Sequence, residues 1–389
     1  MKPLSNLFPL SNIKPMCGEP RKIVLILGNG FDLDLGLKTL YKDFWESEFC
    51  PKDYPAPLIY HLNQWWNDDL EAVKWYDMEN ELLKYYMDMA SPHAPKDFIT
   101  EEEKEFLTVF EPYKWDYGMY NDKVDIVQSL VDKRVILVAN KIIRQLYVPY
   151  KEDISQSPVW RDRKALQLIK EGLCKYLEAL KYEREARDTV AFQVLQFLAI
   201  EGEEKSSVAI YSFNYTNVKY FVYSAKDANI HYMHGSCSDG RIIIGTRDER
   251  EIIENYDFLQ KSFDPSFNPP ALVADLQDAD EVVIFGHSIG DTDRQYFKAF
   301  FLQQTNFANT HRKDITIFTR DAASELQIKR SLERMTDWNL STLYGLNNLQ
   351  IIKTGDIKED QEKLFTFLIK HGKEELATRE FIGKLIQKT

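Results

Sequence analysis

Hydrophobic and polar positions follow one another in two different rhythms along the chain. Residues 23–27 read Ile-Val-Leu-Ile-Leu and are apolar at every position, which predicts a parallel strand buried on both faces. This run leads directly into Gly28-Asn29-Gly30 and then into 33–46, where apolar residues recur at helical spacing. The pattern therefore predicts a strand, a tight turn and a helix.

From residue 51 to residue 202 the pattern is almost entirely helical. The amphipathic segments are rich in Trp, Tyr, Leu, Glu and Lys, and they cover 59–90, 124–147 and 160–200. We predict a helical insertion or cap domain over 51–202, within an α/β domain made of 21–50 and 203–389. Residues 1–20 carry four prolines and predict an irregular N-terminal arm.

Strand patterns return after the helical segment and alternate with helices. The strands are expected at 208–212, 230–233, 241–245, 281–285, 315–319 and 349–353, and the helices at 293–303, 321–335, 358–371 and 373–387. This alternation predicts an α/β fold: a Rossmann-like, mostly parallel sheet with helices on both faces and a large helical insertion after the first strand-helix unit. In such sheets ligands bind beyond the carboxyl ends of the strands.

Composition narrows the classes of function. The net charge of −12 makes a nucleic-acid partner unlikely, because binding phosphates needs a surplus of Lys and Arg. The four cysteines form no C-x-x-C pair, which disfavours a zinc site or a disulfide framework and leads us to expect no metal and a cytoplasmic protein. No apolar run approaches the ~20 residues of a membrane helix, so no membrane partner is expected.

The turn after the first strand is a candidate phosphate site. Gly28 and Gly30 allow a tight turn and a close approach by a ligand, and the N-terminus of the following helix offers N–H groups to an anion. The full G-x-G-x-x-G motif and the Walker lysine are both absent. A purely structural turn, with Asp32 as a helix-capping residue, is an equally good interpretation.

Polar residues follow two later strands. Asn214 can hold a ribose hydroxyl or a water, although an ordinary turn asparagine would look the same. His234 stands beside Gly235 and can act as a general base near neutral pH. His231, three positions earlier, is interpreted as structural.

The segment after 281–285 has the form G-x-S-x-G, from Gly286 to Gly290. This is the sequence form of a nucleophile elbow, so a serine hydrolase using Ser288 is an alternative. Such a site also needs a histidine later in the chain, and only His311 and His371 follow. Otherwise Ser288 is a ligand or turn residue, and the acidic residues that follow, Asp291 and Asp293, begin a helix.

Several of these segments resemble the AbiH family of bacterial anti-phage proteins. The opening signature comprises Ile26-Leu27-Gly28-Asn29-Gly30-Phe31-Asp32, Gly36-Leu37-Lys38-Thr39 and Tyr41-Lys42-Asp43-Phe44. Later motifs follow in the same order: Trp75 to Leu82, Ser212-Phe213-Asn214-Tyr215-Thr216, His234-Gly235, Ile243-Ile244-Gly245 and Phe285-Gly286-His287-Ser288 with Asp291 and Asp293. The resemblance spans roughly residues 22–300 and implies a function in abortive infection.

The same order of motifs is similar to the sirtuin-like domains of bacterial defence proteins, which bind NAD in a Rossmann-like sheet. This similarity implies NAD as the substrate, with Asn214 and His234 as the catalytic residues. It implies cofactor contacts from Gly28, Asn29, Gly30, Phe31, Asp32, Thr216, Gly235, Gly286, His287, Ser288 and Asp291. The turn departs from the sirtuin Gly-Ala-Gly pattern, and the zinc-binding cysteines of deacetylating sirtuins are absent.

The leading hypothesis is therefore an NAD glycohydrolase of phage defence that cleaves the nicotinamide glycosidic bond. The alternatives are a non-catalytic nucleotide sensor, the serine hydrolase and, less favoured by the acidic charge, a nuclease. We further expect a homo-oligomer, a nucleotide as the small-molecule partner and a phage-derived trigger.

Overall fold

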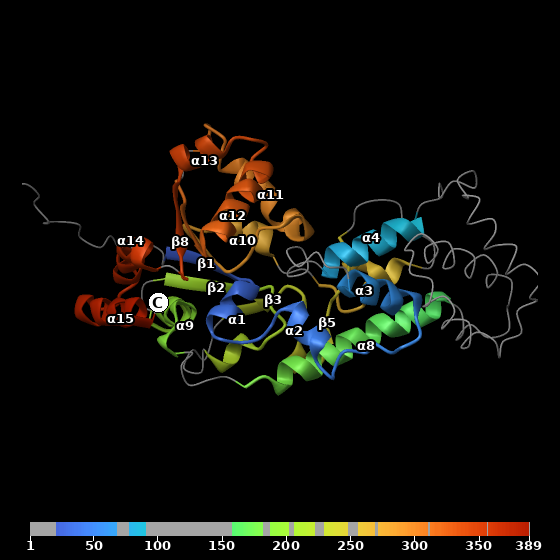
Figure 1. Cartoon of the computed structure of the whole chain (residues 1–389). Helices are drawn as coiled ribbons and strands as arrows, with labels where there is room; N and C mark the ends of the chain where they lie inside the picture. Colours follow the sequence, from blue (N-terminus) through green and yellow to red (C-terminus); the bar gives the residue numbers. More distant parts are fainter. Residues whose placement is uncertain are drawn as a thin grey trace, which may run out of the picture.

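A parallel sheet lies at the centre of the protein (Figure 1). The computed structural model describes residues 21–67, 78–90, 158–181, 187–201, 206–221, 229–247, 256–268, 271–309, 312–355 and 357–388. Within these ranges the sheet has six strands in the order β3-β2-β1-β6-β7-β8. They are β1 (Arg21–Leu27), β2 (Ser206–Ser212), β3 (Asn229–Tyr232), β6 (Glu281–Phe285), β7 (Asp314–Thr319) and β8 (Asn348–Lys353).

The strand order reverses next to β1. The chain proceeds from β1 through β2 to β3 on one side and then returns to place β6 on the other side of β1, with every neighbouring pair parallel. This is the order of a Rossmann-like sheet, which confirms the predicted fold class. The carboxyl ends of β1 and β6 form the switch point, where such folds hold their ligands.

Helices cover both faces of the sheet, as the fully apolar β1 run predicts. Ile23, Leu25 and Leu27 face one core, while Val24 and Ile26 face the other. The first core is closed by α1 (Asn29–Asp34), α9 (Val190–Gln196), the π-helix η4 (Phe197–Glu201), α14 (Ile357–Lys370) and α15 (Glu375–Lys388). The second is closed by α10 (Leu272–Asp278), α11 (Arg294–Gln303), α12 (Ala322–Met335) and α13 (Leu340–Leu346).

The helix predicted over 33–46 is two short helices. Helix α1 ends at Asp34, and α2 begins only at Tyr41 (Tyr41–Glu46). Between them Gly36 has φ 84°, a left-handed conformation through which an α-helix cannot continue. The strand predicted at 241–245 is also shorter, since β5 (Arg241–Ile242) pairs only with β4 (Gly235–Ser236) as a small antiparallel ribbon.

The helical insertion has a hydrophobic core of its own. Its described helices are α3 (Pro57–Asn67), α4 (Met78–Ala90) and α8 (Pro158–Ala179), which lie together on the side of the sheet away from α14 and α15 (Figure 1). Their core also takes in Phe44 and Trp45 of α2 and Ile242 of β5. The helix predicted at 124–147 lies outside the described residues. Helix α9, predicted as part of the insertion, packs against the sheet instead.

The remaining described elements are short 3-10 helices in the connections between strands and helices. They are η5 (Val218–Tyr220), η6 (Cys237–Asp239), η7 (Asp257–Leu259), η8 (Lys261–Phe263) and η9 (Asp291–Asp293). We call the region formed by the carboxyl ends of β1, β2, β3 and β6 the carboxyl edge. Over the described ranges no helix is both long and apolar enough to cross a bilayer.

Candidate functional site

The glycine turn after β1 is packed against the turn after β6. Gly28 N–H donates to the Phe285 carbonyl at 2.9 Å, and Gly30 N–H donates to the Gly286 carbonyl at 2.9 Å. A Cβ on Gly286 would lie 2.4 Å from the carbonyl carbon of Gly30. The glycines therefore let two backbones meet at the switch point, and the N–H groups of Gly28 and Gly30 bind the protein's own carbonyls.

Asn214 joins the end of β2 to this turn. Its Nδ2 donates to the Gly28 carbonyl at 3.0 Å, and the side chain is buried. Two residues later, Thr216 Oγ1 donates to Asp32 Oδ2 at 2.8 Å. The structure thus brings Gly28, Asp32, Asn214 and Thr216 together, although they come from segments that are far apart in sequence.

Asp32 is fully enclosed within this group. Its side chain is 1% exposed, and burial raises its pKa to about 7 against the opposing effect of hydrogen bonds from Thr216 and Asn214. The carboxyl group is consequently half protonated near neutral pH. A helix-capping residue alone would not require this enclosure, so Asp32 belongs to the candidate site.

His234 lies beside a carboxylate that it shares with a second histidine. Its Nε2 is 3.3 Å from Asp293 Oδ1, and His287 Nε2 is 3.3 Å from Asp293 Oδ2. His287 Nδ1 accepts a hydrogen bond from Ile289 N–H at 2.9 Å, which leaves the ring proton on the Nε2 that faces Asp293. Phe213, next to Asn214, packs against both imidazole rings, with centroid separations of 5.4 and 4.4 Å.

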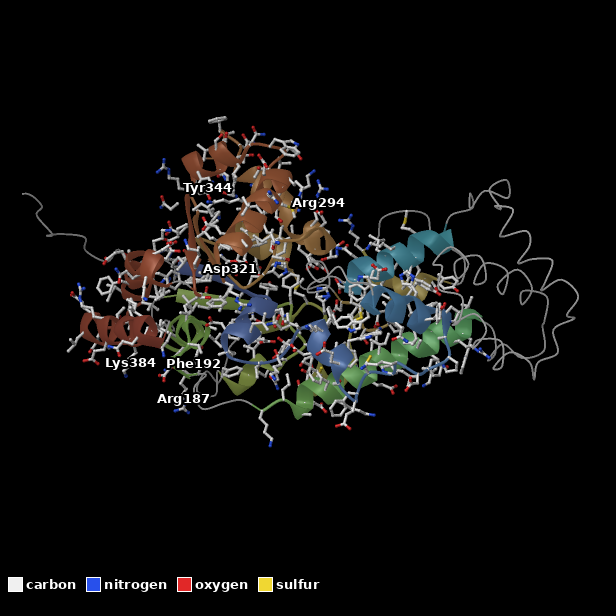
Figure 2. The ribbon with its side chains drawn as sticks, viewed as in Figure 1. Arg187, Phe192, Arg294, Asp321, Tyr344 and Lys384 are labelled. Carbon is white, nitrogen blue, oxygen red and sulfur yellow. The ribbon has the colours of Figure 1, made fainter. Side chains whose placement is uncertain are left out.

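A lysine and a glutamate extend the cluster into the helical insertion. Lys261 of η8 is 3% exposed, and its Nζ lies 2.8 Å from Glu79 Oε2 and 3.6 Å from Asp293 Oδ1. Glu79 stands at the start of α4. In Figure 2 the labelled Arg294 marks where α11 begins, directly after Asp293. The insertion therefore contributes a charged group to the carboxyl edge.

Burial and charge together fix the protonation states in the cluster. Burial lowers the pKa of His234 to about 3, and the charge of Lys261 acts in the same direction, so the imidazole is uncharged at neutral pH. Burial alone would raise the pKa of Asp293, but Lys261 and the two histidines hold it below its usual range. The cluster thus sets a neutral imidazole beside a carboxylate anion.

The groups are of the kinds used in acid-base chemistry, but the pKa of His234 differs from the expectation of a base that titrates near neutral pH. An uncharged imidazole can accept a proton from a water or a hydroxyl group, but a pKa of about 3 makes His234 a weak base, so the adjacent carboxylate must stabilise the resulting charge. Strongly shifted pKa values at the switch point of an α/β sheet are typical of functional sites. Within the described residues no group of three His, Cys, Asp or Glu side chains is arranged to hold a metal ion.

Sequence reasoning missed three members of this cluster. Asp293 does begin a helix as predicted, since it is the N-cap residue of α11, but its contact with the two histidines was not predicted, and Glu79 and Lys261 were not singled out. Lys261 begins the three-residue 3-10 helix η8, which has no periodic pattern, so its sequence carries no signal of burial. For Asp293 the signal was available, because it follows a strand of the same sheet as His234.

Other predicted contact residues have different surroundings. Phe31 is a core residue whose ring packs edge-on against Phe285, with centroids 5.7 Å apart. Asn29 Oδ1 accepts from Thr39 Oγ1 at 2.6 Å, and Asp291 Oδ2 pairs with Arg334 at 3.2 Å. Gly235 has φ 75° in the β4 ribbon. These residues surround the cluster rather than forming it.

The serine hydrolase arrangement finds no support in the described part of the chain. Ser288 is exposed, and no hydrogen bond described there joins it to a histidine. His371 lies at the opposite end of β6, where its Nε2 is 3.2 Å from Glu281 Oε2. His311, the other later histidine, lies outside the described residues.

Comparison with known proteins identifies one family. The model of the family described as bacteriophage abortive infection AbiH matches residues 24–313. This match includes every residue of the cluster from Gly28 to Asp293. No match was found among curated proteins, and none among solved structures. Because the family model covers well over half of the chain, the protein belongs to the AbiH family of bacteriophage abortive infection proteins.

Proposed function

We propose that this protein defends its host against phage by binding a nucleotide, NAD, at the carboxyl edge and hydrolysing the nicotinamide glycosidic bond. Membership of the AbiH family supports the role in abortive infection. The observation that carries the catalytic part is the buried group of His234, Asp293 and His287, which lies beside the Gly28 turn at the switch point. The resemblance of the motif order to sirtuin-like defence domains suggests NAD as the nucleotide.

The proposed reaction replaces the bond between the ribose C1′ and the nicotinamide nitrogen by a bond to water. Nicotinamide leaves with the bonding electron pair, water adds to C1′, and the products are nicotinamide, ADP-ribose and a proton. Uncharged His234 would accept that proton, either from water or from a ribose hydroxyl. The negative charge of Asp293 would stabilise the positive charge that develops on the ribose in the transition state.

The residues around His234 would position the substrate. Asn214 would hold the ribose or the attacking water, and the Gly28 turn would let the pyrophosphate come close to the backbone. Asp32 and Thr216 would hold Asn214 and the turn in place. The space beside Gly28 and Gly30 is filled by the backbone of Gly286 and His287, so the pyrophosphate would approach another side of this turn.

Variants of two histidines on the same segment test the proposal. NAD and nicotinamide would be measured in phage-infected cells that express wild type, His234→Ala, Asn214→Ala or His231→Ala. His231 is the matched control, because its ring stacks on Tyr211 at 4.8 Å and serves packing. We expect NAD to fall after infection in cells that express wild type or His231→Ala. The loss should be at least tenfold slower with His234→Ala, because this variant lacks the general base, and it should also be slower with Asn214→Ala.

Two results would change the assignment. If His234→Ala and Asn214→Ala keep both NAD loss and phage protection, the proposed site is wrong. If the purified protein binds NAD but releases no nicotinamide, even with an infected-cell extract as the source of the trigger, the protein is a nucleotide sensor. The low exposure of the cluster, from 3% for Lys261 to 15% for Glu79, favours this second candidate.

A further inference from the structure

Ile289 adopts a backbone conformation that a β-branched residue rarely takes. Its φ is 51°, in the left-handed region, and its side chain is buried in the hydrophobic core that contains Phe297. This conformation is costly for a residue with two branches on Cβ, and such backbone strain gathers at functional sites. The strained turn has one direct result: the Ile289 N–H donates to His287 Nδ1 at 2.9 Å.

Both ring nitrogens of His287 are engaged by the protein itself. Because Nδ1 accepts from Ile289, the ring proton is on Nε2, which donates to Asp293 Oδ2 at 3.3 Å. The ring packs edge-on against Phe213, and the His287 Cα lies so close to Gly28 that a Cβ there would come within 2.5 Å of it. His287 therefore has a fixed place and a fixed tautomer, with no nitrogen left to take a proton from a substrate.

Asp293 presents its two carboxylate oxygens to two different histidines. Oδ2 accepts the hydrogen bond from His287, and Oδ1 lies 3.3 Å from His234 Nε2. A carboxylate group rotates easily about its terminal bond, so a donor fixed on one oxygen decides where the other oxygen lies. Lys261 Nζ is 3.6 Å from Oδ1, but an ammonium group is a point charge that sets no direction.

We propose that His287 is a positioning residue without a part in proton transfer: in the tautomer fixed by Ile289, it donates the one hydrogen bond that aims Asp293 at His234. The two histidines that share a carboxylate thus have different roles. What Asp293 does for His234 rests on the proposed function. The donor role of His287 is tested by phage protection, whatever the substrate.

Two amide variants separate a hydrogen-bond donor from a group that transfers protons. The amide nitrogen of glutamine comes near the place of Nε2, so His287→Gln keeps a donor for Asp293. Asparagine is one methylene shorter, so His287→Asn keeps an acceptor for the Ile289 N–H but does not reach Asp293. Neither amide titrates, which means that a proton-transferring histidine would be lost equally in both variants. Asp293→Ala is the reference for complete loss of the carboxylate.

Phage protection, measured as the efficiency of plating, compares the two amides in cells. We expect His287→Gln to protect within about tenfold of wild type, and His287→Asn to lose about a hundredfold, approaching Asp293→Ala, as for a misplaced catalytic group. The urea midpoints of the two purified amide variants should lie close together, because each loses one of the two hydrogen bonds of the ring. Equal loss of protection in both, or a loss that follows the urea midpoints, overturns the proposal.

Nitrogen-15 NMR of the imidazole rings tests the tautomer in the wild-type protein and needs neither phage nor NAD. The His287 signals are assigned by their disappearance in His287→Gln. We expect a proton on Nε2 and none on Nδ1, and a proton on Nδ1 overturns the proposal. Should His287→Asn not fold, this spectrum and the protection given by His287→Gln decide. If wild type protects without consuming NAD, the proposed function fails, while the comparison of the two amides still decides the role of His287.

Discussion

Burial acts on Asp32 and His234 in opposite directions on the pH scale and for one physical reason. Each side chain is less stable when charged inside the protein, so the pKa of Asp32 rises to about 7 while that of His234 falls to about 3. Both groups are therefore neutral at mildly acidic pH, and Asp32 ionises as the pH passes neutrality. At neutral pH, His234 is thus uncharged while the Asp32 carboxyl group is partly ionised.

Asp32 makes folding stability depend on pH in a direction unusual for an aspartate. Its folded pKa of about 7 exceeds the ordinary value of 3.8, so the folded state binds more protons and stability falls as pH rises through this window. Between pH 5 and pH 8 we expect a loss on the order of 2 kcal/mol for wild type and a much smaller one for Asp32→Asn. Urea unfolding at the two pH values measures this. Equal losses in both proteins would show that Asp32 is not the cause.

Gly286 is predicted to tolerate no side chain, because two backbones meet at it. Gly286→Ala would combine a φ of 65° with a Cβ placed 2.4 Å from Gly30 and Phe31 backbone atoms. We expect a cost of about 3 kcal/mol or more in unfolding free energy. Gly36→Ala is the control, since Gly36 also has positive φ but open space around it, and it should cost about 1 kcal/mol. Similar costs at both positions would contradict the close approach.

Among the helices and strands, those whose conformation depends on the local sequence were predicted from the pattern of apolar residues. The apolar run of β1 predicted a strand buried on both faces, and its side chains do alternate between two cores. The break at Gly36 was missed because apolar spacing continues across it, while the backbone conformation of one glycine decides the matter. Helix α13 was also missed, since Leu340–Leu346 is too short for a periodic pattern.

The candidate site was only partly predictable, because its contacts are not local. Asn214 and His234 could be placed at one edge by the rule for parallel strands. The contact of Lys261 with Glu79 joins residues 182 positions apart and depends on how the insertion docks, which no pattern in either segment encodes. Asp293 is the helix start that the sequence predicts, but that pattern carries no signal of its contacts with His234 and His287.

Helix α14 is fastened to the amino end of β6 by a buried acidic residue. Glu281 is 0% exposed and contacts Lys370 at 2.9 Å and His371 at 3.2 Å. Glu281→Ala removes the contact with His371 and one of two carboxylate partners of Lys370, which also contacts Asp314 at 2.9 Å, and we expect a loss of about 2 kcal/mol in chemical unfolding. Asp278→Ala, which removes an exposed pair with Lys22, should cause no measurable change. An equal effect of the two variants would contradict the fastening role.

The contacts of Glu281 with Lys370 and His371 also predict how folding stability changes at acidic pH. Burial alone would raise the pKa of Glu281, but His371 and Lys370 hold it below its ordinary value of 4.5. Its stabilising contribution is therefore fully present above that value and is lost as the pH falls through the lower, folded pKa. Wild type should lose more stability than Glu281→Gln when the pH is lowered from 6 to 3. A parallel decline in both proteins would show that Glu281 contributes nothing there.

At the scale of the whole molecule, sheet and insertion contribute to one site. The family match ends at residue 313, before β7, so the matched region contains the entire cluster while the last two strands, α14 and α15 lie beyond it. Lys261 links Glu79 of α4 to Asp293, which His234 also contacts.

A crystal structure of His234→Ala with NAD would show whether the nucleotide binds at the carboxyl edge. We expect the nicotinamide ribose within about 3 Å of Asn214, beside Asp293 and the space left by His234, with the pyrophosphate next to the Gly28 turn. NAD bound elsewhere on the protein, with Asn214 and Asp293 still packed as they are without it, would contradict the account.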